Sequence, residues 1–162
     1  MSIEFFLSSV LKWISLLLLF ASLLFVYRGL PDPAAVHFDS MGQPDGFLPK
    51  EQLFYVMTGI VLFFNIVVGY LAKAIKKLPL KSVYFRSKGE GMIQTILSYF
   101  LNFGLVLLNL YLAYVLRVLL MVNDSRTETM DFSYLGSLGL IFFLIWIIYP
   151  FARIFFLPNK NN

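Results

Sequence analysis

The sequence contains no cysteine and a single histidine, His37. Disulfides, thiolate metal sites and cysteine nucleophiles are therefore excluded, and one histidine cannot form a histidine-based metal cluster within one chain. Charged residues make up only 14% of the 162 residues, whereas soluble domains carry about 25%. These charged residues are too few to cover the surface of a soluble domain of this size. The apolar side chains that remain exposed therefore need lipid as their solvent.

Catalytic signatures are also absent from the sequence. It has no G-x-S-x-G, no H-E-x-x-H, no P-loop and no Rossmann fingerprint. A serine nucleophile needs an oriented base, and the one histidine lies in a connecting loop. We therefore expect a protein that is not an enzyme and that binds no cofactor and no metal.

Hydrophobic residues make up 59% of the chain, and the mean hydropathy is +0.79. About 20 apolar residues span the ~30 Å hydrocarbon core as a helix, and four stretches meet this length. They run from about Trp13 to Tyr27, Leu53 to Ala72, Met92 to Val122 and Tyr134 to Phe151. The first stretch is longer than an ordinary signal peptide core, which favours an uncleaved helix. The predicted fold is an all-α integral membrane protein with a bundle of four transmembrane helices.

Basic residues are distributed unevenly among the loops between these stretches. Residues 28–52 and 123–133 are acidic on balance, whereas residues 73–91 carry six basic residues against one glutamate. Because cytoplasmic loops are enriched in Lys and Arg, residues 73–91 are predicted to be cytoplasmic and the chain to be N-in/C-in. We expect these basic residues to meet anionic lipid rather than nucleic acid: Lys73, Lys76, Lys77, Lys81, Arg86 and Lys88.

The candidate functional residues inside the predicted spans are the three most interior amides and one charge: Asn65, Asn102, Asn109 and Arg117. Asparagines at such depth usually form hydrogen bonds between helices, and a polar pathway for an ion or small solute is the alternative. Arg117 is predicted to sit near the outer interface. There it either snorkels to water or forms an ion pair with a carboxylate of loop 28–52.

Loop 28–52 is rich in residues that restrict or reverse the chain, with four prolines and two glycines between Pro31 and Pro49. Such composition predicts a compact, ordered external cap rather than an unstructured linker. His37, Asp39 and Asp45 are candidates for binding a cation. Hard cations prefer six or more oxygen ligands, so we favour turn-forming hydrogen bonds for these side chains.

The same loop resembles the signature loop of SdpI-type bacterial membrane proteins, which joins the first two helices of their N-terminal domain. The resemblance lies in Leu30-Pro31-Asp32, Val36-His37-Phe38, Gly42, Asp45 and Lys50. It implies a multi-pass protein of the bacterial cytoplasmic (inner) membrane, with a role in immunity to a peptide toxin or in signal reception. It divides the chain into an SdpI-like unit, residues 1–91, and a C-terminal transmembrane hairpin, residues 92–162.

Two hypotheses of function follow. In the first, the external loop is the recognition surface of an immunity or receptor protein, and Pro31, His37, Phe38, Asp39, Gly42, Asp45 and Lys50 are its candidate residues. In the second, the chain is a small accessory subunit that binds another membrane protein or further copies of itself. A transporter is a third, weaker alternative, because no carboxylate or histidine lies in the middle of a span.

Overall fold

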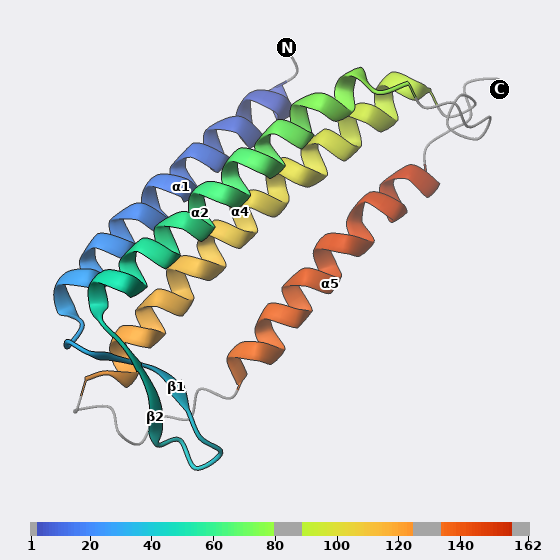
Figure 1. Ribbon diagram of the computed structural model, residues 1–162. Helices are drawn as coiled ribbons and strands as arrows, with labels where there is room; N and C mark the ends of the chain where they lie inside the picture. The colour runs from blue at the N-terminus through green and yellow to red at the C-terminus, as the bar shows by residue number, and fades with distance from the viewer. Residues whose placement is uncertain (1–2, 80–88, 125–133, 157–162) are drawn as a thin grey trace.

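The computed structural model describes residues 3–79, 89–124 and 134–156. Helix α1 (Ile3–Gly29) leads into two short strands, β1 (Ala34–Phe38) and β2 (Pro44–Leu48). Helix α2 (Lys50–Ala74) then ends in the 3-10 turn η1 (Ile75–Lys77), and the chain continues with α4 (Glu90–Val122) and α5 (Tyr134–Phe155). Figure 1 shows the long helices with the strands gathered at one end.

All four helices are long and apolar enough to cross a membrane, which confirms the four predicted segments. The spanning windows have mean hydropathies of 2.0 to 2.2. At ~1.5 Å per residue, the 33 residues of α4 extend about 50 Å, well beyond the ~30 Å hydrocarbon core. Helix α4 is therefore longer than an upright crossing of the apolar layer requires.

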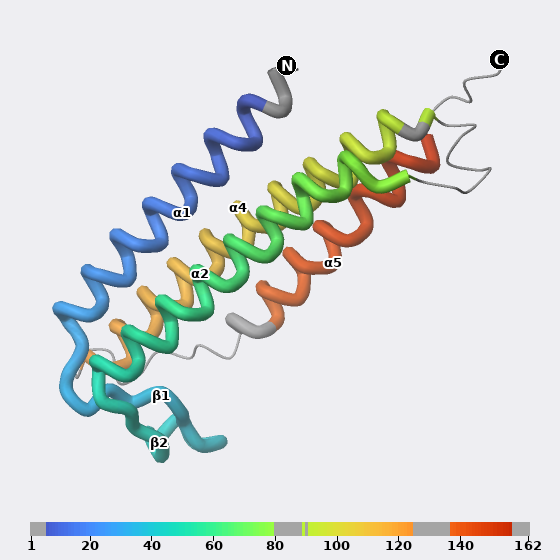
Figure 2. Tube along the Cα trace, turned by 45° about the horizontal axis from the view of Figure 1, so that its top comes forward, coloured from blue at the N-terminus to red at the C-terminus, as the bar shows by residue number. Residues whose placement is uncertain are grey.

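Helix α4 is the centre of the bundle. It packs along α1 and α2 and also contacts η1 and α5. Helix α5 packs chiefly against α4 and lies apart from α1, as both views show (Figures 1 and 2). The first three helices thus form a compact group, and α5 is an outlying helix attached through α4.

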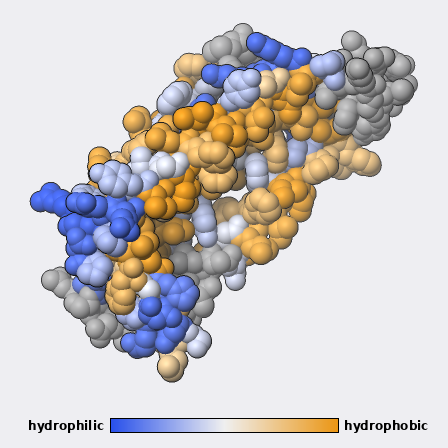
Figure 3. Space-filling model, in the orientation of Figure 1, coloured by the Kyte–Doolittle hydropathy of each residue, from blue (hydrophilic) through white to orange (hydrophobic). Residues whose placement is uncertain are grey.

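The most continuous buried cluster lies where α1, α2 and α4 approach the strands. It contains Leu19, Leu23, Val26, Leu30, Ala34, Leu53, Val61 and Leu116. Elsewhere the helices turn large apolar side chains outward, including Phe63 and Ile145, each 60% exposed. Hydrophobic residues cover the middle of the bundle and hydrophilic ones gather toward its ends (Figure 3). This distribution suits a protein whose sides face lipid.

The segment predicted to be a compact connection folds as an antiparallel β-hairpin. Ala34 pairs with Leu48 and Phe38 with Pro44, and the register shifts on either side of His37. Two strands alone are marginally stable, so the hairpin depends on contacts with the helix ends beneath it. It lies at the end of the bundle where α1 ends and α2 begins (Figure 1).

Candidate functional site

The base of the hairpin is fixed by a side chain from α4. Asn123, at the C-terminal end of that helix, accepts a hydrogen bond from Ala35 N at 2.8 Å through Oδ1. Its Nδ2 donates to Ala35 O at 2.9 Å. Because Ala34 and Ala35 are buried, 0% and 6% exposed, these bonds satisfy backbone groups that water cannot reach. Asn123 was not predicted as a functional residue, because its position just beyond a long apolar run is the only signal of it in the sequence.

The tip of the hairpin is organised by Asp39. Its Oδ1 accepts hydrogen bonds from Met41 N and Gln43 N, both at 2.8 Å. Asp39 N donates to Gln43 O at 2.9 Å. Gly42 has a φ of 79°, a conformation that glycine adopts without strain. The turn-forming roles expected of Asp39 and Gly42 thus agree with the geometry.

Asp32 lies at the other side of the hairpin base, before β1. Its Oδ1 accepts a hydrogen bond from Lys50 N at 3.2 Å, at the first residue of α2. A carboxylate there complements the unpaired N–H groups and the positive end of the helix dipole. The Lys50 ammonium lies 5.6 Å from the Tyr27 ring centroid. Lys50 therefore joins the ends of α1 and α2, and the neighbouring Pro31 is exposed.

The exposed face of the hairpin combines charge with apolar side chains. His37 Nδ1 contacts Asp45 Oδ1, and the two form an ion pair when the imidazole is protonated. Gly46 lies opposite His37, and a Cβ there would come within 2.8 Å of His37 Cβ, so the position suits glycine. Met41 is 81% exposed and Phe47 54% exposed, whereas Phe38 is partly buried.

The candidate cation ligands do not converge. His37 faces Asp45, while Asp39 is bonded to the backbone of its own turn. In residues 3–79, 89–124 and 134–156, no group of three His, Asp or Glu side chains is placed to hold a metal ion. The hairpin therefore offers a paired and hydrogen-bonded surface rather than a ligand cage.

The intramembrane asparagines form a network between three helices. Asn65 of α2 and Asn109 of α4 exchange two hydrogen bonds, Nδ2 to Oδ1 at 2.9 Å and 3.1 Å. Asn109 Nδ2 also donates to Ser15 Oγ of α1 at 3.2 Å. Asn109 is fully buried. This is the interhelical bonding favoured from the sequence. Asn102 is also buried on α4, at 7% exposure.

The expected ion pair between Arg117 and loop 28–52 is wrong. The Arg117 guanidinium lies 4.7 Å from the centroid of the Phe25 ring on α1. Both Arg117 and all of residues 28–52 are described by the structure, and no ion pair joins Arg117 to a carboxylate of that loop. A cation over an aromatic face is stabilised by the ring quadrupole. Arg117 is therefore held by Phe25 of α1 and not by a carboxylate of the loop.

The predicted basic segment is only partly described. Lys73 lies in the last turn of α2, and Lys76 and Lys77 lie in η1. The charge of Lys73 repels that of Lys12 on α1. Lys81, Arg86 and Lys88 lie outside the described residues. Lys73, Lys76 and Lys77 thus lie at the end of the bundle opposite the hairpin (Figure 1).

By length and composition, the four helices define a multi-pass membrane protein. Residues 14–62 match the family model described as "Domain of unknown function (DUF1648)". The match runs from α1 through the hairpin into the first half of α2. No curated protein and no solved structure matches the chain. The description of the family states no function, so the SdpI-type resemblance stays an expectation.

Proposed function

We propose that the chain is a non-enzymatic protein of the bacterial cytoplasmic membrane, with both termini in the cytoplasm and the hairpin outside. The uneven distribution of Lys and Arg supports this orientation. Lys73, Lys76 and Lys77 lie at one end of the bundle, and Asp32, Asp39 and Asp45 lie in or beside the hairpin at the other end. In this orientation the lysines face the anionic cytoplasmic leaflet.

In this proposal the hairpin is the recognition surface of an immunity or signal-receptor protein. The observation that carries it is the contrast between the base and the face of the hairpin. Asn123 and Asp32 fix the base to α4 and α2, while Met41 and Phe47 remain exposed beside the His37–Asp45 pair. A rigid surface that combines apolar and charged groups favours binding, because little ordering entropy is lost.

The same contacts couple the position of the hairpin to that of the helices. A ligand that shifts β1 also shifts the bonds between Ala35 and Asn123, and hence the end of α4. Asn109 on α4 is bonded to α1 and α2. A displacement of α4 would therefore strain these hydrogen bonds and move α1 and α2 with it.

Recognition by the hairpin is tested by sensitivity to extracellular peptide toxins in a strain that lacks the protein. We expect the wild-type chain to restore resistance and the double variant Met41→Ser, Phe47→Ser to fail. Leu78→Ser is the matched control, since Leu78 is 54% exposed at the opposite end. Equal sensitivity of the deletion and wild-type strains to every candidate peptide would overturn the immunity role.

An accessory subunit of a larger membrane complex, or a homo-oligomer, is the second candidate. It is favoured by the sparse packing of α5, whose large side chains are mostly exposed, such as Leu140 and Ile148 at 60% and 61%. Purification in mild detergent tests this alternative. Recovery of the chain as a monomer, with no co-purifying membrane protein, would count against it.

A further inference from the structure

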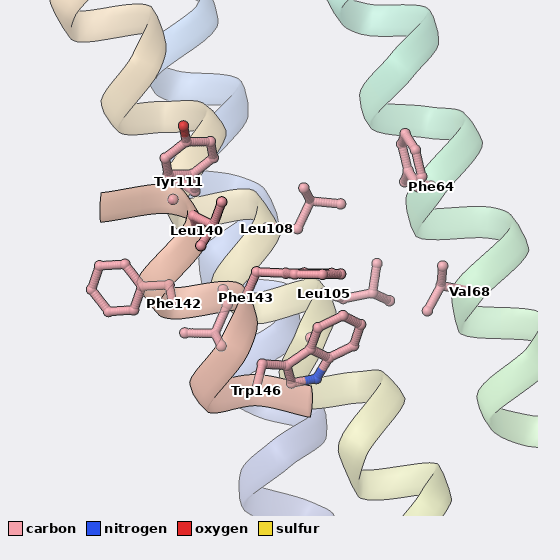
Figure 4. A pocket seen from close by; sticks show the side chains of 12 residues that line it. Phe64, Val68, Leu105, Leu108, Tyr111, Leu140, Phe142, Phe143 and Trp146 are labelled. Carbon is pink, nitrogen blue, oxygen red and sulfur yellow. The ribbon is translucent and has the colours of Figure 1, made fainter. Parts of the chain in front are cut away.

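An apolar groove of about 620 Å³ lies between α2, α4 and α5 (Figure 4). Helix α4 provides its floor with Leu105 and Leu108, and Phe64 and Val68 of α2 face Phe143 of α5 across it. Its lining residues are apolar or aromatic. Its size is within the ~300–1,000 Å³ of pockets that hold one ligand molecule.

Two contacts between an aromatic ring and a glycine fix α5 on α4. Trp146 stacks on Phe100, with ring centroids 4.4 Å apart, and its Nε1 donates to Phe100 O at 2.9 Å. The same indole lies over Gly104, where an added Cβ would come within 2.3 Å of it. Tyr111 covers Gly139 in the same way, at 2.7 Å. The groove is thus built into the contact between the two helices.

A cation lies at one end of α5, which forms one wall of the groove. Helix α5 carries Arg153 in its last turn. This end of α5 lies on the side of the molecule opposite the hairpin (Figures 1 and 2). Arg153 follows Trp146 by seven residues, which places it near the same face of α5 and about 10 Å further along.

We propose that this groove binds an acyl chain of an anionic phospholipid, whose phosphate is held by Arg153. Inside the apolar layer the groove requires a hydrocarbon occupant, and at its basic end a guanidinium binds phosphate oxygens in pairs. Basic pockets between transmembrane helices recognise such headgroups. The inference rests on the membrane insertion and orientation proposed above, but not on recognition by the hairpin.

The two tryptophans of the chain, Trp13 and Trp146, allow a direct test. The variant Trp13→Phe keeps Trp146, which lines the groove. It is reconstituted in vesicles of phosphatidylglycerol and phosphatidylcholine, one of which carries bromine midway along its acyl chains. We expect brominated phosphatidylglycerol to quench Trp146 more strongly than brominated phosphatidylcholine at the same mole fraction.

One variant tests the contact with the lipid phosphate, and another tests the contact with the acyl chain. Arg153→Gln should lower the preference for the anionic lipid about fivefold. The matched control, Arg28→Gln, removes one cation in the last turn of α1 at the hairpin end and should leave the preference unchanged. Val68→Phe places a ring in the groove and should reduce quenching of Trp146 by either lipid.

Two results would overturn the lipid site. Equal quenching of Trp146 by both lipids means that only ordinary boundary lipid reaches the groove, and no quenching means that a helix or a second copy covers it. Trp13, 60% exposed on α1, reports insertion in the variant Trp146→Phe. If Trp13 is quenched and Trp146 is not, the lipid site alone fails. If neither is quenched, membrane insertion fails with it.

Discussion

The amide of Asn123 pairs with the backbone of Ala35 as a neighbouring strand would, accepting from its N–H and donating to its carbonyl. The two residues are 88 positions apart. Asn123 lies beyond residues 14–62, the part of the chain that matches the family model. The hairpin of the matched segment is therefore positioned by a helix outside it.

Asn123→Ala should loosen the hairpin without unfolding the bundle. The variant leaves the buried N–H and C=O of Ala35 without partners, which costs about 1–3 kcal/mol. Hydrogen exchange measures this directly. We expect faster exchange at residues 34–38 and 44–48, and unchanged protection in the middle of α2.

Gln52→Ala is the matched control for Asn123→Ala. It also removes a side-chain amide, but from an exposed position in the first turn of α2. Surface substitutions of this kind usually change stability by less than about 0.5 kcal/mol. Similar exchange of the hairpin in the two variants would show that Asn123 does not hold it.

The reciprocal amide pair of Asn65 and Asn109 predicts energetic coupling between α2 and α4. We expect Asn65→Leu and Asn109→Leu each to destabilise the protein, and Asn109→Leu more, because Ser15 also loses its bond to the amide. In a double-mutant cycle the coupling should be about 0.6–1.7 kcal/mol. Unfolding in mixed detergent micelles measures it, and strictly additive effects would mean that the pair contributes no interaction energy.

Gly104→Ala should detach α5 from α4, since the added methyl group would overlap the Trp146 ring at 2.3 Å. We expect loss of the stacking on Phe100, seen as a shift in the emission of Trp146 in the Trp13→Phe background. Gly59→Ala is the control, because nothing lies within 4 Å of a Cβ there. Replacing glycine in a helix should stabilise α2 by up to about 1 kcal/mol. An unchanged emission spectrum in Gly104→Ala would contradict the close contact.

The four spans could be predicted from the sequence because hydropathy is a local property that follows from consecutive residues. The prolines and glycines of loop 28–52 likewise indicated a compact structure, and Asp39 and Gly42 form the expected turn. The pairing of β1 with β2 was not predicted. The strands are only five residues each, and their sequences show no regular alternation of apolar and polar residues that would predict a strand. Contacts with the helix ends stabilise them instead.

Contacts between residues far apart in the chain could not be predicted from the sequence. Nothing local to Asn123 indicates that its partner is Ala35. An ion pair with a carboxylate of loop 28–52 was one of two alternatives for Arg117, but the face of α4 that carries it meets Phe25 on α1. The groove depends on how α5 leans on α4, which is set by Trp146 over Gly104 and Tyr111 over Gly139. Such relationships follow from tertiary packing and not from composition.

The sidedness of the protein can be measured because the chain has no cysteine, so any introduced thiol is unique. Met41→Cys places one at the tip of the hairpin, 81% exposed, and Lys77→Cys places one beyond the other end of α2. In sealed right-side-out vesicles, we expect a membrane-impermeant maleimide to label Met41→Cys at once and Lys77→Cys only after permeabilisation. The reverse pattern would place the hairpin in the cytoplasm and remove the basis for recognition of an extracellular peptide. Labelling of both from one side would mean that α2 does not cross the membrane.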